Sequence, residues 1–326
     1  MYMTRCIFDA FKVDSLQPPY DTGIARIYYP AQYGDTFEER NTGAVPVDGA
    51  MAPCPVLILF HGINIDPAGY RWLAESLATS GIVTVTYQLV AEEMPGYVAA
   101  TPGIDLKALT PDEFGKRPSA LALPAIFAML ERLNNKGLLA GKLDLQRLAF
   151  GGHSAGGTLA LLNARPSWFP ALRAVFAYGA HTGASTLLGW PEETLLPVSA
   201  DLPVLLIGGD KDGCIAHSAH RYGSDNASAT ARIEQTFDSA VPENNGNNTL
   251  LLLNGANHFS ICAPADDTCG RSFIDFPADS DQGRKAAGRA IVLFLQCHLR
   301  GDTETQADYQ ELTGIAHQSI LKLMHK

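Results

Sequence analysis

The sequence predicts an α/β protein built on a mostly parallel sheet that helices cover on both faces. Short and nearly continuous apolar runs recur along the chain, and segments with helical spacing of apolar residues lie between several of them. Such runs are typical of strands buried on both faces, and their alternation with helices implies right-handed crossover connections. The runs are residues 56–60, 82–87, 148–150, 174–178, 204–207 and 250–253.

The first part of the chain predicts an antiparallel pair of strands. Residues 7–13 and 23–29 are rich in β-branched and aromatic residues, and a turn signal with two prolines separates them. Residues 34–55 are polar and rich in Gly and Pro, which predicts a loop. Apolar residues at spacings of three and four predict helices further along. These helices are expected at residues 70–79, 125–134, 155–163 and 283–299.

Three intervals are longer than a simple crossover needs: residues 91–117, 182–200 and 215–248. Intervals of this length are usually lids or binding loops, or they contain helices that the pattern does not reveal. We expect one domain over residues 1–326, with these intervals as insertions.

The C-terminal tail, residues 302–326, has apolar residues at helical spacing, which predicts an amphipathic helix. These residues are Leu312, Ile315, Ile320 and Leu323.

Composition and charge restrict the classes of protein and of ligand. The 326 residues are 46% hydrophobic and 18% charged, as in folded globular proteins. A formal net charge of -10 argues against nucleic acid as a partner and leaves a small or apolar substrate. No apolar run reaches the roughly 20 residues of a membrane span. Residues 1–12 lack the apolar core of a signal peptide, so a cytoplasmic protein is expected.

The most informative motif is Gly152-His153-Ser154-Ala155-Gly156, which has the pattern G-x-S-x-G. It directly follows the predicted strand 148–150 and opens a predicted helix, the context in which this pattern marks a catalytic serine. A strand that turns abruptly into a helix strains the central residue and leaves no room for side chains two positions away. The alternative is a glycine-rich turn with an incidental serine. The context favours Ser154 as a nucleophile.

A serine hydroxyl is a weak nucleophile and needs a base, which an acid must orient. Asp210 and Asp212 follow the predicted strand 204–207, and His258 follows the strand 250–253. All three leave the carboxyl ends of strands, where open α/β sheets place their sites. The chain order Ser, Asp, His is the order expected for a G-x-S-x-G protein of this architecture.

From about residue 56 to residue 300 the chain resembles the α/β-hydrolase superfamily. In that family the acid commonly lies in a Gly-x-x-Asp-x-x-Val/Ile turn, and Gly209, Asp212 and Ile215 match this turn. The resemblance implies that Asp212 is the acid, with Asp210 as the second choice, better suited to bracing the turn. His258, in a Gly-x-x-His-Phe turn, becomes the base.

The family's oxyanion loop begins with His-Gly, which matches His61 and Gly62. By this resemblance the backbone N–H groups of Ile63 and Ala155 form the oxyanion hole. The His-Gly-Ile-Asn sequence differs from the His-Gly-Gly-Gly of the hormone-sensitive-lipase branch. The closer likeness is to dienelactone-hydrolase-like, platelet-activating-factor-acetylhydrolase-like and polyester-hydrolase-like esterases.

These features predict hydrolysis of carboxylic esters through an acyl-enzyme intermediate. The loops at 91–117 and 178–191 are expected to form the substrate pocket, and no metal or other cofactor is expected. Two alternatives stay open: acyl transfer by the same residues to an alcohol or thiol, and a non-catalytic binding protein. The candidate lining residues are Met94, Tyr97, His181 and Trp190.

Among the six cysteines, Cys214 follows the proposed acid and Cys262 follows the proposed base. Some polyester-hydrolase-like enzymes join these two loops by a disulfide, so the resemblance suggests a Cys214–Cys262 bridge. A bridge from Cys262 to Cys269 competes with it, and free thiols in a reducing compartment are the third possibility.

Overall fold

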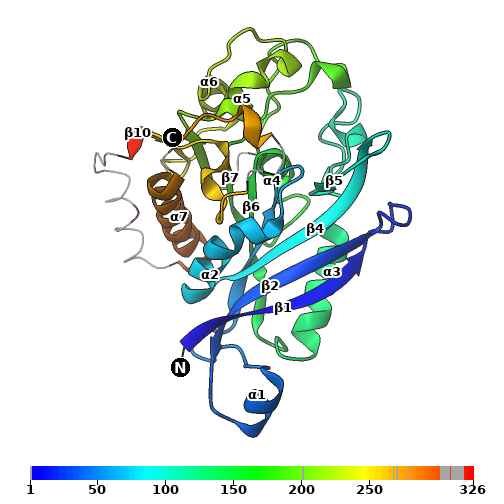
Figure 1. Ribbon diagram of the computed structural model, residues 1–326, viewed down its shortest axis with the longest axis vertical. Coiled ribbons are helices and arrows are strands. Elements are labelled where there is room, and N and C mark those ends of the chain that lie inside the picture. The colour runs from blue at the N-terminus through cyan, green and yellow to red at the C-terminus, as the bar shows by residue number, and fades with distance from the viewer. Residues whose placement is uncertain are drawn as a thin grey trace.

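The computed structural model describes residues 2–199, 202–266, 268, 271–278, 280–301, 309 and 319–326. In this part of the chain ten strands form one sheet, in the order β1-β2-β4-β3-β6-β7-β8-β9-β10, with β5 paired to β4 (Figure 1). The strands are β1 (Tyr2–Lys12), β2 (Thr22–Gln32), β3 (Cys54–Phe60), β4 (Val83–Met94), β5 (Tyr97–Thr101), β6 (Leu143–His153), β7 (Leu172–Tyr178), β8 (Val204–Gly209), β9 (Thr249–Leu253) and β10 (Ile320–His325).

The centre of the sheet is parallel, which confirms the predicted class of sheet. Strands β4, β3, β6, β7, β8 and β9 are consecutive neighbours, and each pairs in parallel with the next. Strands β1 and β2 form the predicted antiparallel pair, with Ile7 opposite Ile27. Because neighbouring parallel strands end at the same edge, the loops that follow β3, β6, β7, β8 and β9 meet there.

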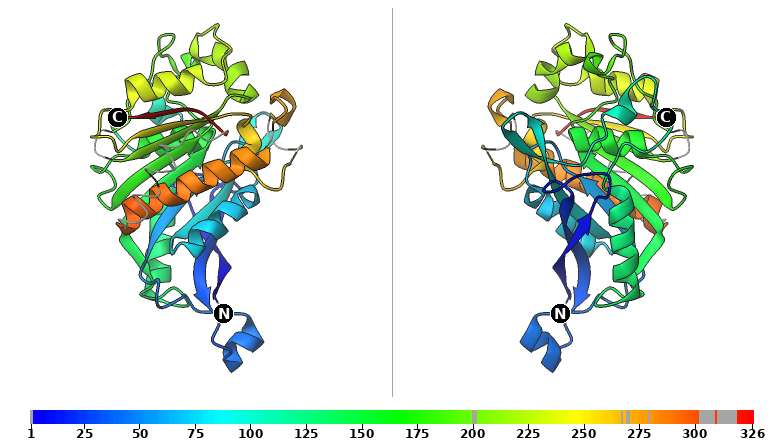
Figure 2. Two further views of the ribbon diagram at one scale, coloured as in Figure 1. Left: turned by 90° about the vertical axis from the view of Figure 1, so that its left-hand side faces the viewer. Right: turned by 90° about the vertical axis from the view of Figure 1, so that its right-hand side faces the viewer.

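Helices pack on both faces of the sheet (Figure 2). Val56 and Ile58 of β3 belong to one buried cluster, to which α3 contributes, whereas Leu57 and Leu59 belong to a second cluster with α2 and α7. This division follows from the alternation of side chains along a strand. The helices are α1 (Phe37–Thr42), α2 (Arg71–Thr79), α3 (Leu123–Asn135), α4 (Ala155–Asn163), α5 (Gly213–His217), α6 (Ala231–Gln235) and α7 (Ser280–Leu295).

The predicted loop at residues 34–55 contains the short helix α1, so the prediction of a loop throughout is wrong. A capping box stabilises its start: the Glu39 N–H donates to the Thr36 hydroxyl, and the Glu39 carboxylate accepts the Thr36 N–H. Gly43, with a φ of 69°, ends it. Two local caps therefore outweigh the loop-like composition of the surrounding residues.

The long intervals contain further secondary structure. In 91–117 the chain completes β4 and returns as β5, which forms an antiparallel hairpin with it. The interval 215–248 contains most of α5 and all of α6. None of the helices in the described ranges has the length and apolar character needed to cross a membrane.

The predicted tail helix is wrong for its last residues, whereas Tyr309, which is also described, is helical. Ile320 and Leu323 lie in β10, which pairs antiparallel with β9. An edge strand exposes unpaired N–H and C=O groups, and β10 supplies partners for those of β9. Leu312 and Ile315 lie outside the described residues.

Candidate active site

The candidate residues gather at the carboxyl ends of four strands of the sheet. Gly62 and Ile63 follow β3, Ser154 follows β6, Asp212 follows β8 and His258 follows β9. The chain positions are up to about 200 residues apart, so only the sheet order brings them to one edge.

Ser154 occupies a strained turn between β6 and α4. Its φ of 56° and ψ of -128° are outside the regions that a residue with a side chain normally adopts. The backbone holds this conformation through two hydrogen bonds: the Ser154 N–H donates to the Tyr178 carbonyl oxygen at 3.0 Å, and the Thr158 N–H donates to the Ser154 carbonyl oxygen at 3.0 Å. Such strain is concentrated at functional sites.

Glycines make the close packing of this turn possible. A Cβ at Gly152 would lie 2.2 Å from the Gly156 carbonyl oxygen, and a Cβ at Gly156 would lie 2.3 Å from the Phe60 carbonyl oxygen. A Cβ at Gly62 would lie 3.2 Å from the Ser154 Cβ. The start of α4 therefore contacts the end of β3 directly, and the loop after β3 lies against the serine.

Asp212 and His258 form a buried pair. The Asp212 Oδ2 atom lies 2.8 Å from the His258 Nδ1 atom, and the two residues are 0% and 3% exposed. The Asp212 Oδ1 atom accepts the Ile215 N–H at 2.8 Å, as the N-cap of α5. One oxygen thus anchors the acid to its own turn, while the other holds the imidazole.

The pKa of His258 is raised. Burial lowers it, but the charge and hydrogen bond of Asp212, together with the charge of Asp275, outweigh burial, while Arg271 opposes them. The ring therefore accepts a proton more readily than an ordinary imidazole.

Gly179 has no side chain, so Asp212 and His258 can lie directly against its Cα atom at the edge of the sheet. No sequence motif identifies Gly179. It follows β7 with a φ of 56°, and a Cβ there would lie 3.1 Å from both the Asp212 Oδ2 and the His258 Nδ1 atoms. Its neighbour Tyr178 accepts the Ser154 N–H. Residues 178 and 179 therefore contact the serine turn on one side and the acid–base pair on the other.

His258 also lies against the serine turn. Its ring centroid is 4.7 Å from that of His153, the residue before Ser154. No hydrogen bond joins the Ser154 hydroxyl to His258 in the described structure. Catalytic hydrogen bonds are often long without substrate and shorten when it binds.

Two backbone N–H groups beside this site make no hydrogen bond within the described part of the chain. Neither the Ile63 N–H nor the Ala155 N–H donates a hydrogen bond within the described part of the chain, although their neighbours do: the Asn64 N–H donates to Ala100 and the Ile65 N–H to Gly62. Both unpaired donors lie next to residues in contact, Gly62 and Ser154. Fixed and unpaired N–H groups are the donors that an oxyanion hole requires.

Tyr70 joins the loop after β3 to the serine turn. Its hydroxyl accepts the Gly62 N–H at 3.3 Å and lies 2.8 Å from the His153 Nδ1 atom. Burial, together with the neighbouring His258, holds the pKa of His153 well below its ordinary value, so the ring is neutral and shares one hydrogen bond with the Tyr70 hydroxyl. His153 therefore has a packing and bridging position, and sequence patterns alone do not identify Tyr70.

The four candidate lining residues differ in their surroundings. Met94 is exposed near the tip of the β4–β5 hairpin, and the Tyr97 hydroxyl accepts a hydrogen bond from Asn64, beside Ile63. His181 is buried, and its Nδ1 atom accepts the Gly183 N–H. Tyr97 thus lies beside the loop after β3, and His181 lies beside α4, because the Thr158 hydroxyl donates to its carbonyl oxygen at 2.8 Å.

Trp190 packs away from these residues. Its Nε1–H donates to the Leu109 carbonyl oxygen at 2.7 Å, and its ring contacts Phe114 edge to face. These contacts join the interval 91–117 to the interval 182–200, against Leu162 of α4. The two predicted pocket loops therefore support each other through an aromatic cluster.

Among the described residues, no hydrogen bond or ion pair joins Asp210 to Ser154 or His258. Its Oδ1 atom accepts the Gly255 N–H at 2.7 Å, so it joins the acid turn to the loop before the histidine. No disulfide joins any two cysteines within the described ranges, and the Cys214 Sγ atom lies 3.7 Å from the Arg271 carbonyl oxygen. Cys269 lies outside those ranges.

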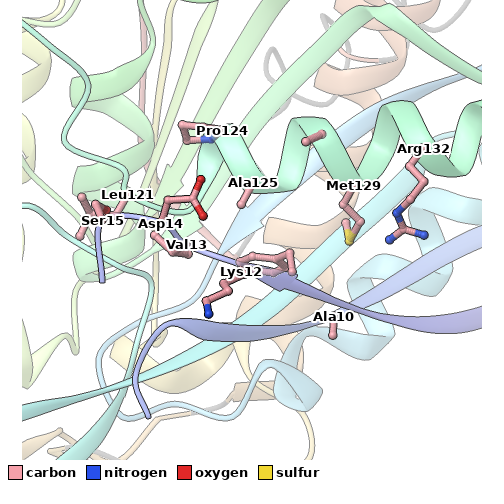
Figure 3. Close-up of a pocket in the computed structure, with 12 residues that line it drawn as sticks. Ala10, Lys12, Val13, Asp14, Ser15, Leu121, Pro124, Ala125, Met129 and Arg132 are labelled. Atoms are coloured by element: carbon pink, nitrogen blue, oxygen red, sulfur yellow. The ribbon is translucent and has the colours of Figure 1, made fainter. Parts of the chain in front are cut away.

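A cavity of about 550 Å³ opens elsewhere, between the first hairpin and α3 (Figure 3). Its cationic side chains already have partners: Lys12 pairs with Asp21 and Arg132 pairs with Asp9. None of the candidate catalytic residues lines it.

Comparison with models of protein families finds no match, and comparison with curated proteins finds none either.

Proposed function

We propose that this protein is a serine hydrolase of the α/β-hydrolase superfamily that cleaves carboxylic esters through an acyl-enzyme intermediate. The observation that carries the proposal is the strained Ser154 turn beside the buried Asp212–His258 pair. Within the superfamily, the His61-Gly62-Ile63 loop favours the dienelactone-hydrolase-like, platelet-activating-factor-acetylhydrolase-like and polyester-hydrolase-like esterases.

The hydrogen bond to Asp212 selects the reactive form of His258. An ionised carboxylate only accepts hydrogen bonds, so the neutral imidazole carries its proton on Nδ1 and leaves the Nε2 lone pair free. That lone pair accepts the proton of Ser154 as its Oγ atom attacks the ester carbonyl carbon.

The ester carbonyl oxygen becomes an oxyanion in this step, and the N–H groups of Ile63 and Ala155 stabilise it. The imidazolium of His258 then protonates the leaving alcohol, which yields the acyl-enzyme. Water attacks the acyl carbon with His258 again as the base, and Ser154 is regenerated. Asp212 stays ionised throughout and stabilises the imidazolium.

A chromogenic short-chain ester and a fluorophosphonate probe test the proposal together. We expect hydrolysis of the ester, and a covalent adduct whose mass maps to the peptide containing Ser154. Addition of an alcohol separates hydrolysis from acyl transfer, because a transferase forms the new ester in preference to the free acid. Folded protein that neither turns over the ester nor reacts with the probe contradicts the proposal and favours a binding protein.

The pH dependence of kcat/KM follows from the raised pKa of His258. The ring must be neutral to accept the serine proton, and a raised pKa keeps it protonated to higher pH. We expect activity to fall on the acid side with a midpoint above the ordinary imidazole value of about 6.5. Initial rates from pH 4 to pH 9 measure it, and a rate that stays level well below pH 6 is inconsistent with His258 as the base.

Replacement of Tyr70 by Phe tests the bridge between the oxyanion loop and the serine turn. Without the hydroxyl, the Gly62 N–H and the His153 ring lose a buried partner, which costs about 1–3 kcal/mol of stability. We expect kcat to fall about tenfold, because Gly62 precedes the Ile63 donor.

Tyr29→Phe is the matched control, since this buried hydroxyl donates to the Val45 carbonyl oxygen from β2, a strand that carries none of the candidate residues. We expect Tyr29→Phe to lower the free energy of unfolding but to leave kcat unchanged. Equal kcat values for the two variants are evidence against a role of Tyr70 in positioning the loop.

A further inference from the structure

A second carboxylate, Asp275, lies between the loops that carry Asp212 and His258. Its Oδ1 atom accepts the Gly213 N–H at 2.7 Å, and its Oδ2 atom accepts the Phe259 N–H at 3.3 Å. Gly213 directly follows the acid, and Phe259 directly follows the base. One side chain therefore joins the residues next to both members of the pair.

The backbone around Asp275 reinforces this connection. A Cβ at Gly213 would lie 2.3 Å from the Ile274 carbonyl oxygen and 2.8 Å from the Asp275 Cα atom, so this close approach requires a glycine. On the other side, the Asn257 amide donates to the Phe276 carbonyl oxygen at 2.9 Å. Residues 274–276 thus hold the acid loop and the base loop together.

Asp275 also acts on its neighbours through its charge. Burial, and then the charge of Asp212, raise its pKa to about 6, although His258 and the two backbone N–H groups favour its ionised form. Its charge in turn raises the pKa of His258, in addition to the effect of Asp212. With a pKa of about 6 the carboxyl group is largely ionised at pH 7, and in that form it favours the protonated imidazole.

Three other titratable side chains near His258, in the part of the chain that the structure describes, carry no charge near pH 7. Burial lowers the pKa of His153 and of His181 and raises that of Tyr178, so all three are neutral near pH 7. Among the described residues, the charged groups that act on the pKa of His258 are Asp212 at the start of α5, Asp275, and Arg271, which opposes them.

We propose that Asp275 is a positioning residue for the proposed ester hydrolysis, which holds the Asp212 and His258 loops in register and stabilises the imidazolium of His258 with a second negative charge. This inference rests on the proposed function. It assigns no contact with the substrate to Asp275, because the side chain acts through the backbone of Gly213 and Phe259 and through its charge on His258.

Asp275→Asn removes the charge and keeps one of the two hydrogen bonds. The amide oxygen still accepts the Gly213 N–H, whereas the NH₂ group that replaces Oδ2 cannot accept the Phe259 N–H, and the negative charge is lost. We expect the pKa of His258, followed by the NMR shift of its ring Cε1–H, to fall by about half a pH unit or more. The acid limb of kcat/KM then moves to lower pH by the same amount, and kcat on the plateau falls about three- to tenfold.

Asp210→Asn is the matched control. Asp210 also accepts a backbone N–H from the base loop, through Gly255, but no hydrogen bond or ion pair joins it to His258 in the described part of the chain. We expect its acid limb and its His258 titration to match those of the unmodified protein. Asp275→Glu restores the charge, so the titration of His258 is expected to return toward the unmodified value even where a displaced carboxylate lowers kcat.

The outcomes of these experiments distinguish a failure of this inference from a failure of the proposed function. An unchanged His258 titration in Asp275→Asn, a shift of equal size in Asp210→Asn, or the same titration in the Asn and Glu variants overturns the role of Asp275. The NMR titration requires no turnover. Absence of esterase activity in the unmodified protein overturns the proposed function instead, while the titration still reports on the charge of Asp275.

Discussion

Ser154→Ala is expected to lower kcat for ester hydrolysis by about 10⁴-fold or more, while the protein stays folded. Alanine removes the attacking oxygen but keeps the Cβ atom, so the packing against Gly62 is preserved. Loss of one triad member leaves only the contributions of the oxyanion hole and of substrate binding. Turnover of a chromogenic ester measures the loss, and thermal unfolding monitored by circular dichroism checks the fold.

A serine outside the site provides the control for this variant. The Ser185 hydroxyl accepts the Leu187 N–H in the interval 182–200, so Ser185→Ala removes a hydroxyl of the same kind without removing a nucleophile. We expect it to keep normal kcat and to react with a fluorophosphonate. A folded Ser154→Ala protein with near-normal kcat would show that another group attacks the ester.

The parts of the fold that the sequence predicts well depend on local patterns. The runs 56–60, 174–178 and 204–207 lie within buried parallel strands, because continuous burial on both faces leaves a continuous apolar run. The helix expected at 155–163 has these bounds in the structure, since a glycine-flanked turn begins it. Local chemistry is sufficient for these elements.

Elements that depend on partners far away in the sequence cannot be predicted from local patterns. The strand β10 forms because β9 has an open edge, and no property of residues 320–325 alone distinguishes it from part of a helix. Similarly, β6 extends from Leu143 to His153, well beyond the apolar run at 148–150. Pairing with β3 and β7 decides its length.

The same distinction holds within the candidate site. The G-x-S-x-G motif lies within a few residues of the chain, so its geometry can be read from sequence. Gly179, Tyr70 and Asp275 contact residues that are far away in sequence, and each belongs to a segment without a motif of its own. Only the tertiary structure reveals that these three residues contact the serine turn, the acid or the base loop.

Asp212→Asn is expected to lower kcat by about three to four orders of magnitude. The amide can still accept the Ile215 N–H through its oxygen, but it then presents an NH₂ group to the His258 Nδ1 atom. The ring responds by carrying its proton on Nε2, which can no longer accept the serine proton. The loss of the Asp212 charge also lowers the pKa of His258, so the remaining activity falls off at lower pH than in the unmodified protein.

Asp210→Asn, two positions earlier in the same turn, is expected to cost less than about fivefold in kcat. Its amide oxygen still accepts the Gly255 N–H, and the ion pair between Asp210 and Lys211, which the substitution removes, is long, at 3.7 Å, and partly exposed. Parallel measurements of kcat and of thermal unfolding for the two variants distinguish the roles of the two carboxylates, because the substitution is chemically identical. A larger loss of kcat in Asp210→Asn than in Asp212→Asn would identify Asp210 as the group that orients the base.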